Sequence, residues 1–265
     1  RSAQLQTQFN PRFGNSDLER VNCIKFLGVL IDCRLSWKTH ITAVSNKVRN
    51  SISQLWNMRK VIPKNLQINV YNAIINSQLS YAIAVWGAFK THDSLKPLFV
   101  LQKRALRNLF SIKRESKFVK GHTKNKFNEL RILTVYNLYN YATLLHLIKL
   151  LIFKKPVYLF ELLELHNVKE EKRKRITPLN LKLSHYQNNF CYQSVKLWNN
   201  LCSSPSQCDS ITCAPTLSCL MSRLKNFIRK AQLFGDVNSW IPINNSLELY
   251  LEAMKNNPYT ENLTA

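Results

Sequence analysis

The sequence has 265 residues, of which 45% are hydrophobic and 11% aromatic. These fractions exclude an intrinsically disordered chain, and the length is sufficient for a buried core that needs no disulfides or metals. Lys and Arg number 38 against 15 Asp and Glu, which gives a formal net charge of +23. Because such an excess of positive charge repels itself, we expect a polyanionic partner, with nucleic acid and an anionic membrane surface as the common candidates.

Other classes of protein are excluded by what the chain lacks. Its five glycines are too scattered to form a GxxxxGK phosphate loop or a GxGxxG fingerprint. Seven cysteines without an export signal favour reduced thiols, so we expect a protein of the nucleus or cytoplasm that is not secreted. The most apolar stretch, residues 132–153, is interrupted by two asparagines, a histidine and a lysine. It predicts a buried or interface helix, and we expect no membrane partner.

The first predicted element is a β-hairpin within residues 21–37, with its turn at Cys33 and Arg34. The apolar run FLGVLI is typical of a strand covered on both faces, and Gly28 within it indicates a bulge or a close approach of another backbone. We expect Thr39 to cap the following helix, which runs to about Lys60 with an apolar stripe at helical spacing.

Two more helices are predicted, one over residues 64–85 that ends near Gly87, and one that begins near Asp93 or Ser94 and runs to about Lys113. In the third helix one face is apolar and the opposite face is a basic stripe without an acidic residue. The apolar face consists of Leu95, Leu98, Leu101, Ala105, Leu106, Leu109 and Ile112, and the stripe consists of Lys96, Lys103, Arg107 and Arg114. Such a stripe is either a solvated face or a surface for phosphate contact.

The rest of the chain contains a basic loop at 113–126, aromatic-rich helices up to residue 153 and a charged linker at 169–175. Two amphipathic helices are predicted within 190–201 and 217–234, and a polar tail follows. The linker is either a solvated segment or a nuclear import signal.

The residues alone identify no catalytic or metal-binding centre. The five aspartates are scattered, and Asp32 is expected to cap a turn rather than to bind a metal ion. The spacing of the C-terminal cysteines fits a zinc site poorly, so ordinary thiols are expected at Cys202, Cys208, Cys213 and Cys219. Each tryptophan is expected in the core, although rings beside basic residues, such as Trp56 beside Arg59 and Lys60, also suit base stacking.

Four motifs in order resemble the reverse transcriptases of non-LTR retrotransposons, especially the jockey-like elements of animals. They are KFLGVLIDCRLSWKTHI at 25–41 with the KVxNSIxxL helix after it, LSYAIAVWG at 79–87, LQKRALRNLF at 101–110 and NNFCYQSVKLWNNL at 188–201. The resemblance covers roughly residues 20–230. It implies an RNA-directed DNA polymerase whose catalytic palm, with its paired aspartates, lies upstream of this sequence.

By this resemblance the chain contains the last palm elements, the thumb and the post-thumb region. We expect a mainly α fold, in which a short N-terminal β-hairpin precedes a thumb-like helical bundle and a second small helical region. The expected divisions are palm edge, thumb, connecting helices, C-terminal helices and tail, at residues 1–38, 39–115, 116–168, 169–234 and 235–265.

The resemblance also implies a role for particular residues. Phe26, Leu27 and Gly28 occupy the position of the primer grip, which holds the growing 3′ end. The thumb lies along the template–primer duplex, and its cations would contact phosphates at Lys38, Lys96, Lys103, Arg104, Arg107 and Arg114. Without the paired aspartates, we expect this chain alone to be inactive and to need no cofactor, while the parent enzyme uses Mg²⁺ and an upstream palm and fingers complete the site.

Two alternatives stay open at this stage. One is a protein-interaction module from a decayed element, which a dispersed distribution of Lys and Arg in the folded chain would favour. The other is peripheral binding to a membrane, which requires one face that combines cations with exposed large apolar side chains.

Overall fold

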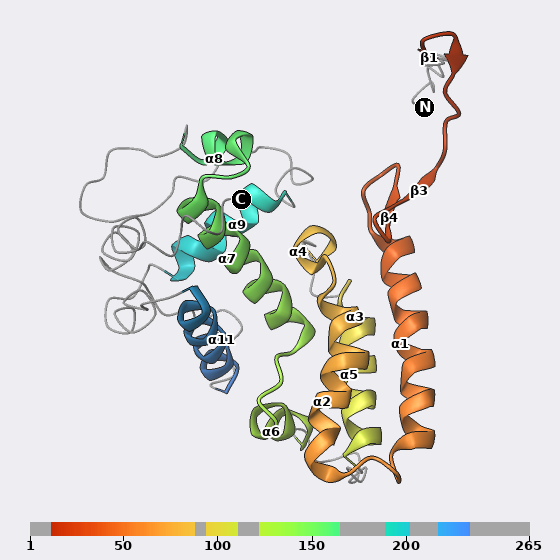
Figure 1. Ribbon diagram of the computed structural model, residues 1–265, viewed down its shortest axis with the longest axis vertical. Coiled ribbons are helices and arrows are strands. Elements are labelled where there is room, and N and C mark those ends of the chain that lie inside the picture. Colours follow the sequence, from red (N-terminus) through yellow and green to blue (C-terminus); the bar gives the residue numbers. More distant parts are fainter. Residues whose placement is uncertain (1–11, 88–93, 111–121, 165–188, 202–216, 234–265) are drawn as a thin grey trace, which may run out of the picture.

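A computed structural model describes residues 12–87, 94–110, 122–164, 189–201 and 217–233 (Figure 1). In these residues the fold is mainly helical and begins with two short antiparallel strand pairs, which confirms the predicted fold class. The first pair is β1 and β2, and the second is β3 and β4. Their bounds are Arg12–Phe13, Ser16–Asp17, Cys23–Phe26 and Val29–Asp32.

Helices α1 and α5 pack side by side and form the bundle with the helical segments between them. The predicted single helix at 64–85 is divided, because Tyr81 is extended and Ala82 has a left-handed φ of 50°. Before this break one turn of helix is of the π type. The bounds are Lys38–Met58 for α1, Lys64–Leu66 for η1, Gln67–Tyr71 for α2, Asn72–Asn76 for η2, Ser77–Ser80 for α3, Ile83–Trp86 for α4 and Lys96–Leu109 for α5.

Helix α7 lies between this bundle and the C-terminal helices (Figure 1). It contacts α3, α4 and α5 on one side and α8, α9 and α11 on the other, which confirms that the apolar stretch at 132–153 is a buried helix. None of the helices in the described ranges has the length and apolarity to cross a membrane. The bounds are His122–Glu129 for α6, Val135–Phe153 for α7, Val157–Glu164 for α8, Phe190–Leu201 for α9 and Leu217–Leu233 for α11.

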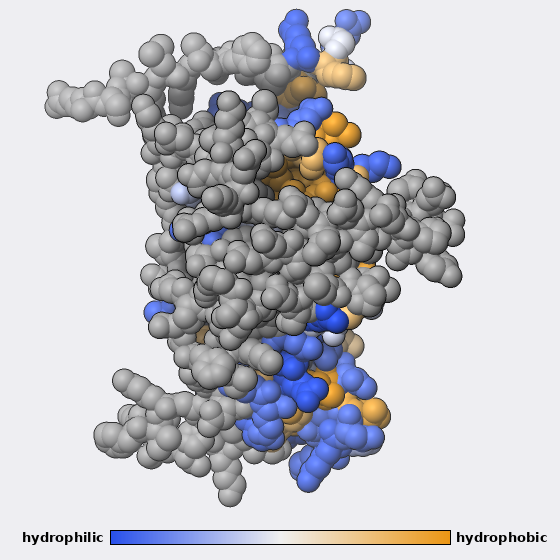
Figure 2. Space-filling view, turned by 90° about the vertical axis from the view of Figure 1, so that its left-hand side faces the viewer, coloured by the Kyte–Doolittle hydropathy of each residue, from blue (hydrophilic) through white to orange (hydrophobic). Residues whose placement is uncertain are grey.

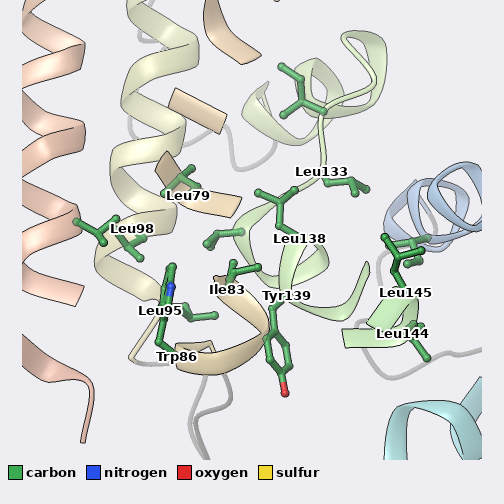
Figure 3. Packing of buried hydrophobic residues seen from close by; sticks show 14 of the residues in the cluster. Leu79, Ile83, Trp86, Leu95, Leu98, Leu133, Leu138, Tyr139, Leu144 and Leu145 are labelled. Carbon is green, nitrogen blue, oxygen red and sulfur yellow. The ribbon is translucent and has the colours of Figure 1, made fainter. Parts of the chain in front are cut away.

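One cluster of buried apolar side chains extends from β4 and α1 through α7 to α11. Figure 3 shows how the side chains of α7 continue the cluster that Trp86 and Leu98 begin. The predicted apolar face of α5 is buried from Leu95 to Leu109, whereas Ile112 lies outside the described residues. The predicted domain boundaries remain predictions.

Gln102 is a fully buried polar side chain on the apolar face of α5. Its Nε2 donates to the hydroxyl of Tyr71 at 3.0 Å and to the carbonyl of Leu133 at 2.9 Å. Its Oε1 accepts from the backbone N–H of Val135 at 2.9 Å. The side chain therefore joins α2, α5 and the start of α7 by three buried hydrogen bonds.

Gly87 ends α4 where this helix meets α7, as the sequence predicted for a helix end. A Cβ at this position would lie 2.6 Å from the carbonyl oxygen of Ile83 and 2.7 Å from Cδ2 of Tyr139. Both distances are shorter than real Cβ contacts, so the packing of α4 on α7 requires glycine here.

Candidate nucleic-acid interface

The β3–β4 hairpin turns at Leu27 and Gly28, because Phe26 pairs with Val29. Both turn residues have positive φ, 45° and 82°, which is the geometry of a two-residue type I′ turn. The prediction that the hairpin turns at Cys33 and Arg34 was wrong, since this second turn connects β4 to α1. Sequence analysis missed the tighter turn because its first residue is a leucine, which rarely adopts positive φ.

Tyr81 fixes the turn of the hairpin to the helical bundle. Its hydroxyl donates to the carbonyl oxygen of Leu27 at 2.6 Å. A Cβ on Gly28 would lie 3.7 Å from the Tyr81 ring, an ordinary contact, so the positive φ is what favours glycine here. The three predicted primer-grip residues thus lie at the turn of the hairpin, and their role in holding a primer stays a prediction. The bulge or close backbone approach expected at Gly28 is not found, because Gly28 is the second turn residue and its neighbour is the Tyr81 side chain.

Three further contacts complete the attachment of the hairpin. The indole Nε1 of Trp86 donates to the carbonyl oxygen of Tyr81 at 2.8 Å. The imidazole of His40 meets this indole edge-on, with ring centroids 5.3 Å apart, and its Nδ1 accepts from the backbone N–H of Leu30 at 3.2 Å. Burial lowers the pKa of His40, and the positive charge of Lys47 lowers it further. A neutral imidazole is therefore favoured, and only that form can accept this hydrogen bond.

Asp32 caps the turn that leads into α1, as predicted. Its carboxylate accepts hydrogen bonds from the backbone N–H groups of Arg34, Ser36 and Trp37 and from the Ser36 hydroxyl, at 2.8–3.2 Å. Burial raises the pKa of Asp32, but these donors together outweigh burial and lower it. The expectation that Thr39 caps the helix was wrong, because α1 begins at Lys38 and has no side-chain cap.

The described residues do not fit the Mg²⁺ ion of a polymerase. The carboxylate of Asp32 is already engaged by four donors. Over the described ranges, no three side chains of His, Cys, Asp or Glu gather as metal ligands. Of the cysteines considered for zinc, Cys219 lies half-buried in α11 and the other three fall outside the described residues.

The tip of the hairpin is apolar and exposed. Phe26 is 60% and Leu27 75% exposed, while Val29 is only 8% exposed because β4 packs on α1. The expectation of a strand covered on both faces was therefore wrong for the described residues. A two-stranded ribbon that rests one face on a helix leaves the other face open.

The basic stripe of α5 is divided by its packing. Within the stripe Lys96 is exposed, whereas Lys103 and Arg107 are half-buried. Arg104, a predicted contact outside the stripe, is exposed. The Nζ atom of Lys103 lies 4.4 Å from the centroid of the Phe99 ring, and burial, with Arg107 nearby, lowers its pKa. Lys103 therefore rests on the ring of Phe99 one turn earlier in α5 as well as contributing charge. The stripe's last member, Arg114, lies outside the described residues.

Helix α1 presents a second basic face, of which the sequence analysis predicted only the first residue. Five exposed side chains lie within roughly 60° of one another on a helical projection: Lys38, Thr42, Arg49, Ser53 and Trp56. All five carry hydrogen-bond donors, and α1 contains no acidic residue. The same projection that was applied to α5 would have found this face.

The sequence of the bundle contains very few acidic residues. From residue 33 to residue 114 the sequence contains 14 Lys and Arg, and Asp93 is its one acidic residue. Figure 2 looks at the side of the molecule away from α1, and there hydrophilic side chains gather at the lower end, where α2 and α6 lie in Figure 1. A bundle with this excess of positive charge attracts the backbone of a polyanion and requires no base-specific contact.

Part of the chain is related to retrotransposon reverse transcriptases. A stretch of 89 residues is 34% identical to the RNA-directed DNA polymerase from mobile element jockey of Drosophila funebris, covering 32% of this chain and 10% of that protein. The Drosophila melanogaster protein of the same description is 29% identical over 89 residues, with the same coverage. The chain thus matches about a tenth of the length of these curated relatives. No family model matches the chain, and no solved structure does.

Proposed function

We propose that this chain is the palm-edge, thumb and post-thumb part of an RNA-directed DNA polymerase of the non-LTR retrotransposon class. In this role it binds the template–primer duplex through its phosphate backbone. The turn at Leu27 and Gly28 approaches the primer 3′ end, and the catalytic aspartates with their Mg²⁺ come from an upstream palm. Such a protein acts on nucleic acid in the nucleus or cytoplasm.

The observation that carries this proposal is the position of the basic face of α1. The helix begins six residues after the end of β4, and Asp32, His40 and Tyr81 fix the hairpin to the bundle. A nucleic acid strand held at the hairpin would therefore meet donors along about 30 Å of helix, since α1 has 21 residues. The similarity to the jockey polymerases supports the same role.

The exposed apolar tip of the hairpin fits the second part of the proposal. Phe26 and Leu27 form an exposed apolar surface at the turn of the hairpin that precedes α1. An upstream palm domain would cover such a surface, because large apolar side chains left in water cost about 1.5–3 kcal/mol each.

The test is binding to a 12-base-pair RNA–DNA hybrid over a salt series. Replacing the two cations of this face, Lys38 and Arg49, by Gln should reduce the slope of log K against log salt by up to about 1.8, because each lost phosphate contact contributes about 0.9. A matched control replaces two exposed lysines on other helices, Lys149 and Lys225, with the same loss of charge. Equal slopes for the two variants would contradict a specific role for α1.

Membrane binding is a second candidate, favoured by the hairpin itself. Phe26, Leu27 and Leu35 are exposed beside the cations Lys25 and Arg34, so one region combines apolar and basic side chains as peripheral binding requires. Co-sedimentation with anionic vesicles distinguishes the candidates. The duplex proposal expects the Leu35→Ser variant, which lies outside the primer-grip residues, to keep its hybrid affinity, whereas membrane binding would be weakened in this variant.

A further inference from the structure

The C-terminal end of α1 carries an exposed ring that the basic face alone does not explain. Trp56 is 48% exposed, although the sequence favoured a place in the core. By contrast, Trp86 and Trp198 are buried. An exposed indole loses the free energy that its burial would provide, so its position needs another explanation.

Arg59 lies on one face of this indole, with Cζ 3.3 Å from the centroid of the ring system. The guanidinium covers that face, so the exposed area belongs to the opposite face and the ring edges. A stacked guanidinium keeps its N–H donors at its rim, where they can reach a phosphate. The pair therefore offers a flat aromatic surface beside a fixed positive charge.

The surroundings of the pair favour an anion. Lys60 and Lys64 follow in the next turns of chain and are exposed. From Lys38 to Leu66 the sequence contains no acidic residue that would compete for Arg59. A ring with a free face next to clustered cations is the arrangement with which proteins bind single strands, since the ring stacks on a base and the cations neutralise its phosphate.

The pair is well separated from the hairpin. Trp56 follows Lys38 by 18 residues, which corresponds to roughly 27 Å along the helix. In a duplex the bases are stacked on one another, so a ring can stack only on an unpaired or terminal base. Hairpin and ring would therefore engage different parts of one nucleic acid.

We propose that Trp56 and Arg59 form a stacking site for an unpaired nucleotide, at the end of α1 remote from the hairpin. This inference rests on the proposed binding of nucleic acid and specifies which strand structure the far end of α1 recognises. Lys60 supplies a further contact to the phosphates of the same strand.

The experiment compares two ligands on the full 265-residue chain, a 12-nucleotide oligouridylate and the 12-base-pair hybrid. Trp56→Ala should weaken binding to the single strand at least about fivefold, because stacking on one base contributes about 1–3 kcal/mol, and it should weaken hybrid binding by a clearly smaller factor. Trp56→Phe should restore most of the single-strand affinity. Met58→Ala is the matched control, since Met58 is an equally exposed apolar side chain at the same helix end.

Tryptophan fluorescence gives a second readout. Binding of the oligouridylate should quench the emission of the wild type, and the quenching should fall in Trp56→Phe although the strand still binds. The stacking site is refuted if Trp56→Ala binds the single strand as the wild type does, or if its affinity for both ligands falls equally. In either case, steep, salt-dependent binding of the hybrid would still support the proposed function. A wild type that binds neither ligand refutes both.

Discussion

The buried amide of Gln102 provides the sharpest test of how the bundle is held against α7. Replacing it by Leu keeps the volume close to that of glutamine but removes three hydrogen bonds. The Tyr71 hydroxyl, the Leu133 carbonyl and the Val135 N–H are then left without this partner. A buried polar group without a partner costs about 1–3 kcal/mol, so the loss should be about 3–6 kcal/mol after partial relaxation.

This loss is a large fraction of the 5–15 kcal/mol by which domains of this kind are typically stable. Urea unfolding followed by circular dichroism should show a midpoint lower by about 1–2 M, with a typical slope of about 3 kcal/mol per M. Gln54→Leu is the control, because Gln54 is exposed on α1 and its replacement should change stability by less than about 0.5 kcal/mol. A Gln102→Leu protein within about 1 kcal/mol of the wild type would refute this account of the junction.

Three further predictions concern the packing of α4 and the attachment of the hairpin to the bundle. Gly87→Ala should lower the free energy of unfolding by about 1–3 kcal/mol, measured in urea, because the added Cβ meets Ile83 and Tyr139; wild-type stability would contradict the close packing. Since burial lowers the folded pKa of His40 from 6.5, the unfolded chain takes up this proton first, and stability is lost as the pH falls below about 6.5. Between pH 7.5 and pH 5.0 the free energy of unfolding should fall less for His40→Gln than for the wild type. Equal falls would contradict the role of His40 in this pH dependence. Tyr81→Phe should cost about 0.5–1.5 kcal/mol and speed amide exchange in β3 and β4, and unaltered exchange would show that the hydroxyl does not hold the turn.

Local patterns in the sequence predict much of this fold. The periodicity of α5 places its leucines correctly in the core, since a single apolar stripe leaves a helix one way to pack. Asp32 was correctly predicted to cap a turn, because carboxylates bind nearby backbone N–H groups over short sequence distances. The apolar stretch that forms α7 was correctly recognised as a buried helix from its internal polar residues.

Features that depend on contacts between distant residues could not be predicted in this way. Gln102 lies on the apolar face of α5, but its partners are 31 to 33 residues away in the sequence. Lys103 looks solvated on a helical projection, which does not show that the Phe99 ring beneath it is covered by α6 and α7. A charge-reversal variant of Lys103 would consequently disturb packing as well as binding, so exposed cations such as Lys38 and Arg49 are better probes.

The place of the hairpin in the bound complex is the central claim, and site-specific crosslinking tests it most directly. A photoreactive nucleotide is placed at the 3′ end of the primer strand of the RNA–DNA hybrid, and the crosslinked peptide is identified by mass spectrometry. The account predicts crosslinks at residues 25–28, which are reduced when Leu27 is replaced by Asp. Crosslinks concentrated instead on α9 or α11, with none at the hairpin, would contradict it.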